Sequence, residues 1–207
     1  MILLVAGTNT DVGKTFVSAA LITALRERGI AVAARKPVQS FAPDATATDA
    51  DLLAAASGED AKTVCLPHRW IAAAMAPPIA AQALELPAFT IKELAHELVT
   101  AERGLTLVES VGGVRSPIAA DGDTIDLADT IRPAFVLLVA DAGLGTINSV
   151  RLSVDALAPH RVVVFLNRFD ASDEVHIRNA EWLRGSEGFE VVTDLDTLLT
   201  TVTARLR

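Results

Sequence analysis

The chain has 207 residues, the usual size of one α/β domain, and 51% of them are apolar, which is enough to build a sizeable core. Its net charge of −8 comes without any basic tract, so nucleic-acid binding is not expected as its main task. No apolar run is long enough to span a membrane, and the single cysteine, Cys65, excludes an intramolecular disulfide. We therefore expect one cytoplasmic domain, residues 1–207, in which Cys65 is a buried small side chain.

Short apolar runs alternate with helical stretches along the chain, a pattern typical of a parallel sheet covered by helices. The predicted strands are Ile2–Ala6, Ala31–Lys36, Leu105–Glu109, Phe135–Ala140 and Val162–Asn167. The predicted helices are Lys14–Glu27, Asp49–Ala56, Ile91–Glu102, Ile125–Ile131, Thr146–Leu157 and Asp173–Leu183. Residues 40–48 and the proline-containing stretch 66–86 are predicted to be irregular, and a last strand near Phe189–Val192 precedes a terminal helix. The fold class is therefore α/β, with a mostly parallel central sheet between two layers of helices.

The residues Gly7-Thr8-Asn9-Thr10-Asp11-Val12-Gly13-Lys14-Thr15 follow the first strand and open the first helix, the context of a phosphate-binding loop. Inward-facing amides and the helix N-terminus attract phosphate, so we expect nucleotide contacts from the run Asp11 to Phe16: Asp11, Val12, Gly13, Lys14, Thr15 and Phe16. The ammonium of Lys14 suits the β- and γ-phosphates, and the hydroxyl of Thr15 suits Mg²⁺. The loop predicts binding of a nucleoside triphosphate, with ATP expected.

Two carboxylates are candidate ligands for Mg²⁺ besides the Thr15 hydroxyl. Glu109 ends a buried strand, where an unpaired carboxylate would be costly, and is the first candidate. The second comes from Asp49 or Asp51 at the start of a predicted helix. Either aspartate suits the ion, although Asp49 could instead cap that helix, which would leave Asp51 as the ligand.

Four motifs together resemble those of the dethiobiotin synthetases. They are the phosphate loop, the run Lys36–Ser40, the run Leu107–Gly113 and the run Leu144–Asn148. Each follows a predicted strand, and because ligands of open α/β sheets bind at the carboxyl ends of strands, the four should meet in one crevice. The segment Met75–Pro78 also resembles a proline-containing segment that lies near the substrate in that family, although a rigid loop over the core is an equal alternative.

The resemblance implies a P-loop NTPase fold and a cyclo-ligase that uses ATP and Mg²⁺. Such an enzyme carboxylates 7,8-diaminononanoate with CO₂ and closes the ureido ring of dethiobiotin, in the biosynthesis of biotin. Lys14 and Lys36 are then the catalytic lysines, and Glu109 and Asn167 lie at the nucleotide, with Asn167 at the adenine edge. Of the two aspartates, Asp49 fits the spacing of the family better as the second metal ligand. The implied substrate contacts are Thr10, Ser40, Gly112, Thr146, Ile147 and Asn148, the last three reaching across a two-fold homodimer.

Two features qualify this interpretation. Glu109 is followed by Ser110-Val111, where the family commonly has Gly-Ala, and the larger side chains are expected to narrow the approach to the metal and the substrate. The alternative function is a regulatory or partitioning ATPase of the same wider fold. Those ATPases typically carry a second lysine at the start of the phosphate loop, a position that Thr8 occupies in this chain.

Overall fold

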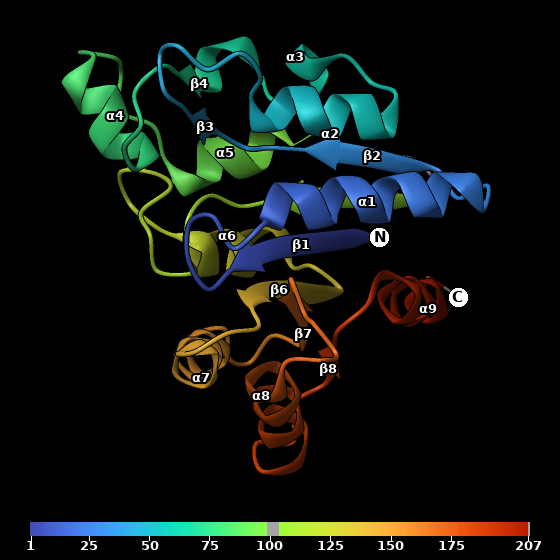
Figure 1. Ribbon diagram of the computed structural model, residues 1–207. Helices are drawn as coiled ribbons and strands as arrows, with labels where there is room; N and C mark the ends of the chain where they lie inside the picture. Colours follow the sequence, from blue (N-terminus) through green and yellow to red (C-terminus); the bar gives the residue numbers. More distant parts are fainter. Residues whose placement is uncertain (99–103, 207) are drawn as a thin grey trace.

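A parallel six-stranded sheet forms the centre of the computed structural model, which describes residues 1–98 and 104–206 (Figure 1). The strand order is β2-β5-β1-β6-β7-β8, and every pairing is parallel. The strands are β1 (Ile2–Gly7), β2 (Val32–Arg35), β5 (Leu105–Glu109), β6 (Phe135–Asp141), β7 (Val162–Asn167) and β8 (Val191–Val192). The predicted α/β class and parallel sheet are confirmed.

Helices cover both faces of this sheet (Figure 1). One hydrophobic cluster joins the sheet to α1 (Lys14–Glu27), α2 (Asp49–Ser57), α3 (Ala61–Val64) and α9 (Leu195–Arg205). The second cluster joins it to α4 (Pro77–Ala83), α5 (Ile91–Glu97), α6 (Thr124–Ile131), α7 (Thr146–Ala156) and α8 (Glu174–Gly185). The three predicted layers are therefore present.

The strand β1 shows why the apolar runs are unbroken. Successive side chains of a strand point to opposite faces, so Leu3 and Val5 enter one cluster and Leu4 and Ala6 enter the other. All four have no exposed surface, as expected for a parallel strand buried on both sides.

The prediction that residues 66–86 are irregular is wrong. This stretch contains a 3₁₀ turn (Pro67–Arg69), strand β4 (Trp70–Ile71) and helix α4, and β4 pairs with β3 (Gln39–Ser40) in a second small sheet. The prolines indicated a break, but they occupy the first helical positions, where a missing N–H costs nothing. The short helix α3 was not predicted either.

Most other element boundaries differ from the prediction by one or two residues, and the end of α5 differs by more. Helix α5 ends at Glu97, with Leu98 as its C-cap, and residues 99–102 of the predicted helix lie outside the described residues. Strand β8 is shorter than predicted, because only Val191 and Val192 pair with β7. None of the helices within the described ranges is both long and apolar enough to cross a membrane.

Cys65 is buried, as predicted, and is 1% exposed within the hydrophobic cluster that contains α1 and α2. Burial raises the pKa of its thiol to about 12. Because the thiolate is the reactive form, we expect a disulfide reagent at pH 8 to label the native protein at least about a hundredfold more slowly than the urea-unfolded protein. Rapid labelling of the native protein would contradict this burial.

Candidate active site

The loop between β1 and α1 curls around the ammonium of Lys14. The Nζ atom donates to the carbonyl of Asn9 at 3.1 Å, and a Cβ added to Gly7 would lie 2.9 Å from the Lys14 side chain. Lys14 is only 8% exposed and forms no ion pair within the described part of the chain. Burial, followed by the charge of Lys36, lowers its pKa to about 8. This buried cation would gain from an anion such as phosphate.

The end of strand β7 holds the same loop from behind. The side-chain amide of Asn167 donates to the carbonyl of Val12 at 2.9 Å, and Asn167 is 8% exposed. Gly13, which follows Val12 in the loop, is the N-cap of α1 and has the left-handed conformation with φ +92°. The structure thus places Asn167 against the loop, and its contact with adenine stays a prediction.

The replacement Gly13→Ala should destabilise the protein more than Gly29→Ala. Both glycines have positive φ, so a side chain at either strains the backbone by roughly 1–2 kcal/mol. At Gly13 the new Cβ would also collide with the Asn167 amide, whereas at Gly29 it meets nothing within 4 Å. We expect urea denaturation to show at least about 1 kcal/mol of additional loss for Gly13→Ala. Equal losses would contradict the contact with Asn167.

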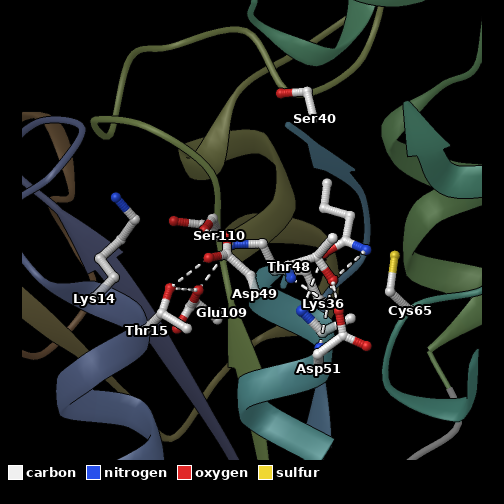
Figure 2. Close-up of polar contacts among 12 residues, drawn as sticks. Lys14, Thr15, Lys36, Ser40, Thr48, Asp49, Asp51, Cys65, Glu109 and Ser110 are labelled. Atoms are coloured by element: carbon white, nitrogen blue, oxygen red, sulfur yellow. Dashed lines mark hydrogen bonds and ion pairs between the residues drawn. The ribbon is translucent and has the colours of Figure 1, made fainter. Parts of the chain in front are cut away.

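Lys36 is the centre of a buried charge cluster, which Figure 2 shows beside Thr15. Its Nζ lies 2.7 Å from Asp49 Oδ2 and 2.8 Å from Glu109 Oε1, and it donates to the Ser110 carbonyl at 3.1 Å. Burial alone would lower the pKa of Lys36, but the two carboxylates outweigh it and raise the pKa above its usual value. Lys36 is therefore a fixed positive charge at neutral pH.

Thr15 joins the phosphate loop to the two carboxylates. Its hydroxyl lies 2.9 Å from Asp49 Oδ1 and 2.9 Å from Glu109 Oε1. Glu109 has no exposed surface, and its Oε2 is buried with no hydrogen-bond partner among the described residues. One hydroxyl and two carboxylates form the oxygen donor set that Mg²⁺ prefers. The residues present therefore fit a Mg²⁺ ion.

The start of helix α2 explains which aspartate belongs to this set. Thr48 is the N-cap, and the Asp51 side chain accepts from the Thr48 amide at 2.8 Å, forming a capping box. Gln39, which is 2% exposed, accepts from the Ala50 amide at 3.0 Å and so fixes the first turn. Asp51 is engaged in the cap, and Asp49 is the carboxylate that faces Lys36 and Thr15. The alternative in which Asp49 caps the helix is wrong.

A cavity of about 820 Å³ opens above this cluster. Ten of the residues predicted for the site line it: Thr10, Asp11, Gly13, Lys14, Thr15, Phe16, Lys36, Ser40, Asp49 and Gly112. Residues 74–77, at the start of α4, form another part of its wall, and Ser40 Oγ donates to the Met75 carbonyl at 2.6 Å. Lysines, hydroxyls and carboxylates thus face one space large enough for a nucleotide and a small substrate.

The segment Thr146, Ile147 and Asn148 lies outside this cavity, at the N-terminus of α7. Asn148 instead lines a separate hollow of about 430 Å³ on the other side of the phosphate loop. Thr146 is 5% exposed, and its hydroxyl has no partner within the described ranges. Within one chain, this segment does not join the other predicted substrate contacts.

Ser110 and Val111, which depart from the family pattern, follow Glu109 at the end of β5. Ser110 is 1% exposed, and its carbonyl receives the Lys36 ammonium. Val111 lines the cavity beside Gly112. Whether this changes substrate geometry stays a prediction.

Gln39 and Arg168 were missed in the sequence. Gln39 holds the turn that carries Asp49, and Arg168 follows Asn167 at the end of β7. The Nη2 of Arg168 donates to the Asp11 carbonyl and its Nη1 to Asp141 Oδ2, both at 2.9 Å. Position at a strand end was a signal available for both residues, but their partners depend on the folded chain.

Comparison with known proteins relates this chain to ATP-dependent dethiobiotin synthetases. A family model described as an AAA domain matches residues 2–200. An ATP-dependent dethiobiotin synthetase of Haloferax mediterranei is 35% identical over 195 residues, which cover 91% of this chain and 81% of that protein. An ATP-dependent dethiobiotin synthetase of a Caulobacter species (strain K31) is 40% identical over 181 residues, which cover 83% of this chain and 78% of that protein.

Solved structures of similar fold are more distant in sequence. A plasmid partition protein of Borrelia burgdorferi bound to AMPPNP has a TM-score of 0.56 at 13% identity, covering 95% of this chain and 88% of that one. Chloroplast FtsY of Physcomitrella patens has a TM-score of 0.55 at 14% identity, and the match covers 98% of this chain and 65% of that one. At such low identity these likenesses show the fold alone.

Proposed function

Because the chain belongs to the ATP-dependent dethiobiotin synthetase family, we propose that it closes the ureido ring of dethiobiotin from 7,8-diaminononanoate, CO₂ and ATP. One substrate amine takes up CO₂ to give a carbamate, whose oxygen attacks the γ-phosphorus of ATP and releases ADP. The second amine then attacks the carbonyl carbon of the mixed anhydride, and phosphate leaves as the ring closes. The observation that carries this proposal is the buried ammonium of Lys36, which faces the same cavity as Lys14 of the phosphate loop.

The two lysines suit different parts of this reaction. Lys14 is a buried cation that forms no ion pair with a carboxylate of the described residues, so its charge is available to the phosphates of ATP. Lys36 keeps its charge through Glu109 and Asp49, so it can neutralise the carbamate and the migrating phosphoryl group, where negative charge gathers. Because its partners hold it in place, little reorganisation is needed as the reaction proceeds.

Thr15, Asp49 and Glu109 are the proposed ligands of Mg²⁺. The Oε2 of Glu109, which has no partner in residues 1–98 and 104–206, and the shared contacts of the Thr15 hydroxyl support this assignment. When bound there, Mg²⁺ would offset the negative charge of the β- and γ-phosphates. The protein atoms that face the phosphates are then the backbone of the loop, Lys14 and Lys36.

We further propose that the substrate carboxylate is bound by Thr146, Ile147 and Asn148 of a second copy of the chain. Their absence from the cavity of their own chain supports a partner's contribution. The N-terminus of α7 is suited to an anion, as is the Thr146 hydroxyl, which has no partner in the described part of the chain. A two-fold homodimer would supply such a contact to each active site.

The test is the reaction itself. Purified protein given 7,8-diaminononanoate, bicarbonate, Mg²⁺ and ATP should release phosphate and form a cyclic urea that mass spectrometry detects. Omission of the diamine is the control and should stop phosphate release. ATP turnover that ignores the diamine would contradict the ligase and favour the regulatory or partitioning ATPase.

A further inference from the structure

Two neighbouring residues at the end of β7 hold two neighbouring carbonyls of the phosphate loop. Asn167 donates to the carbonyl of Val12, and Arg168 donates to the carbonyl of Asp11, each at 2.9 Å. These contacts join positions 155 and 157 residues apart in the sequence. The loop is therefore clamped by a strand that contributes no part of the phosphate-loop motif.

The clamp fixes the direction of the loop amides. A trans peptide is planar, so its N–H points away from its C=O. When the Asp11 carbonyl faces Arg168, the Val12 N–H faces the opposite way, toward the inside of the loop. The Val12 carbonyl turned to Asn167 orients the Gly13 N–H in the same manner. Neither amide donates to another group within residues 1–98 and 104–206, so both remain available to an anion.

Arg168 is itself held in place from the other side. Its guanidinium pairs with Asp141 Oδ2, while Oδ1 of the same carboxylate accepts from the Gly143 amide at 2.9 Å. Asp11 and Arg168 both have positive φ, +59° and +57°, a conformation that side chains other than glycine avoid unless surrounding contacts impose it. One hydrogen bond therefore joins two residues with positive φ.

We propose that Arg168 is a positioning residue for the nucleotide, which sets the Asp11 peptide so that the Val12 amide faces the phosphates. Its role is to orient the loop, and it makes no direct contact with the base. The inference rests on the proposed binding of ATP, and it does not depend on the diamine.

Calorimetric binding without diamine tests this role, with ATP and inorganic tripolyphosphate as separate probes. Arg168→Ala should weaken both by the same factor, about tenfold, because the cost of ordering the loop would then fall on the binding step. Arg168→Lys, which keeps one donor, should recover part of the affinity. Arg178→Ala is the matched control, because Arg178 is an exposed arginine paired with Glu174 on α8, and it should bind both probes as the wild type does.

Three results would overturn the inference. A loss for ATP with none for tripolyphosphate would mean that Arg168 contacts the base. Unchanged affinity for both probes in Arg168→Ala would mean that the loop orients itself. A weaker dependence of affinity on NaCl in Arg168→Ala than in the wild type would mean a direct ion pair with phosphate, because salt screens exposed charges.

Arg168→Ala could also weaken binding simply because the protein unfolds. The variant Asp141→Asn distinguishes this from a positioning role. The amide oxygen of asparagine can still accept from Gly143, but the ion pair with Arg168 is lost. We expect a smaller loss of affinity for both probes at an unchanged melting temperature, and wild-type affinity would count against the inference. If the wild type binds ATP but makes no cyclic urea, the proposed reaction fails while the role of Arg168 remains testable.

Discussion

Replacement of Lys36 by alanine is expected to lower cyclic-urea formation at least about a hundredfold, since a preorganised charge at the reacting group commonly contributes that much. Lys36 is 2% exposed and is fixed by Asp49 and Glu109. A water molecule or a neighbouring side chain cannot supply an ammonium at that position. Affinity for ATP, which depends on the phosphate loop, should change much less. The two effects are measured by a product assay and by calorimetry.

The same replacement should also destabilise the ligand-free protein. It leaves Glu109, with no exposed surface, facing Asp49 without a cation, and breaking a buried pair costs about 3–5 kcal/mol. Added Mg²⁺ should restore part of this loss, because an ion among the same oxygens replaces the missing charge. Lys62→Ala, at an exposed lysine of α3, is the control and should change neither activity nor stability. A fully active Lys36→Ala enzyme would remove this residue from the mechanism.

Replacement of Lys14 by methionine is expected to have opposite effects on binding and on stability. Affinity for ATP should fall at least about tenfold, because one charge-assisted contact with phosphate is lost. The ligand-free protein, in contrast, should become more stable by on the order of 1–3 kcal/mol, since a buried cation that forms no ion pair among the described residues is replaced by an apolar side chain of similar length. Calorimetry and urea denaturation in Mg²⁺-free buffer measure the two quantities.

The gain in stability should depend on pH in a defined direction. In the folded protein the pKa of Lys14 is lowered from 10.5 to about 8, so the charged form is disfavoured by folding. This cost is fully present below pH 8 and disappears as the pH rises from 8 toward 10.5, where the unfolded chain also loses the proton. The stabilising effect of Lys14→Met should therefore shrink over that interval. Lys92→Met, at an exposed lysine of α5, should show no such trend.

The main elements of the fold were readable from the sequence because they depend on local patterns. Helix α1 and strands β5 and β7 have their predicted bounds, since their apolar runs stop at glycine, at charged residues or at turns. The prolines of α4 were misleading because proline breaks a helix in its interior and starts one at its first turn. Distinguishing these cases requires the position of the helix, which the local sequence does not provide.

The candidate site was predictable as a set of strand ends, but its contacts were not. The parallel order β2-β5-β1 brings Lys36, Glu109 and the phosphate loop together, as the motif positions indicated. The choice of Asp49 over Asp51 depends on a capping box, and the role of Arg168 depends on a turn with positive φ. Neither follows from residue type and spacing alone.

The groups that meet at Thr15 come from distant parts of the chain. Thr15 and Glu109 are 94 positions apart, and Lys36 and Glu109 are 73 apart. Each pair of neighbouring strands is joined by a long crossover, so the entropy of loop closure is lost before these groups touch. No partly folded chain that lacks β5 possesses the complete site. A ligand that requires all three groups therefore favours only the finished sheet, and its whole binding free energy opposes unfolding.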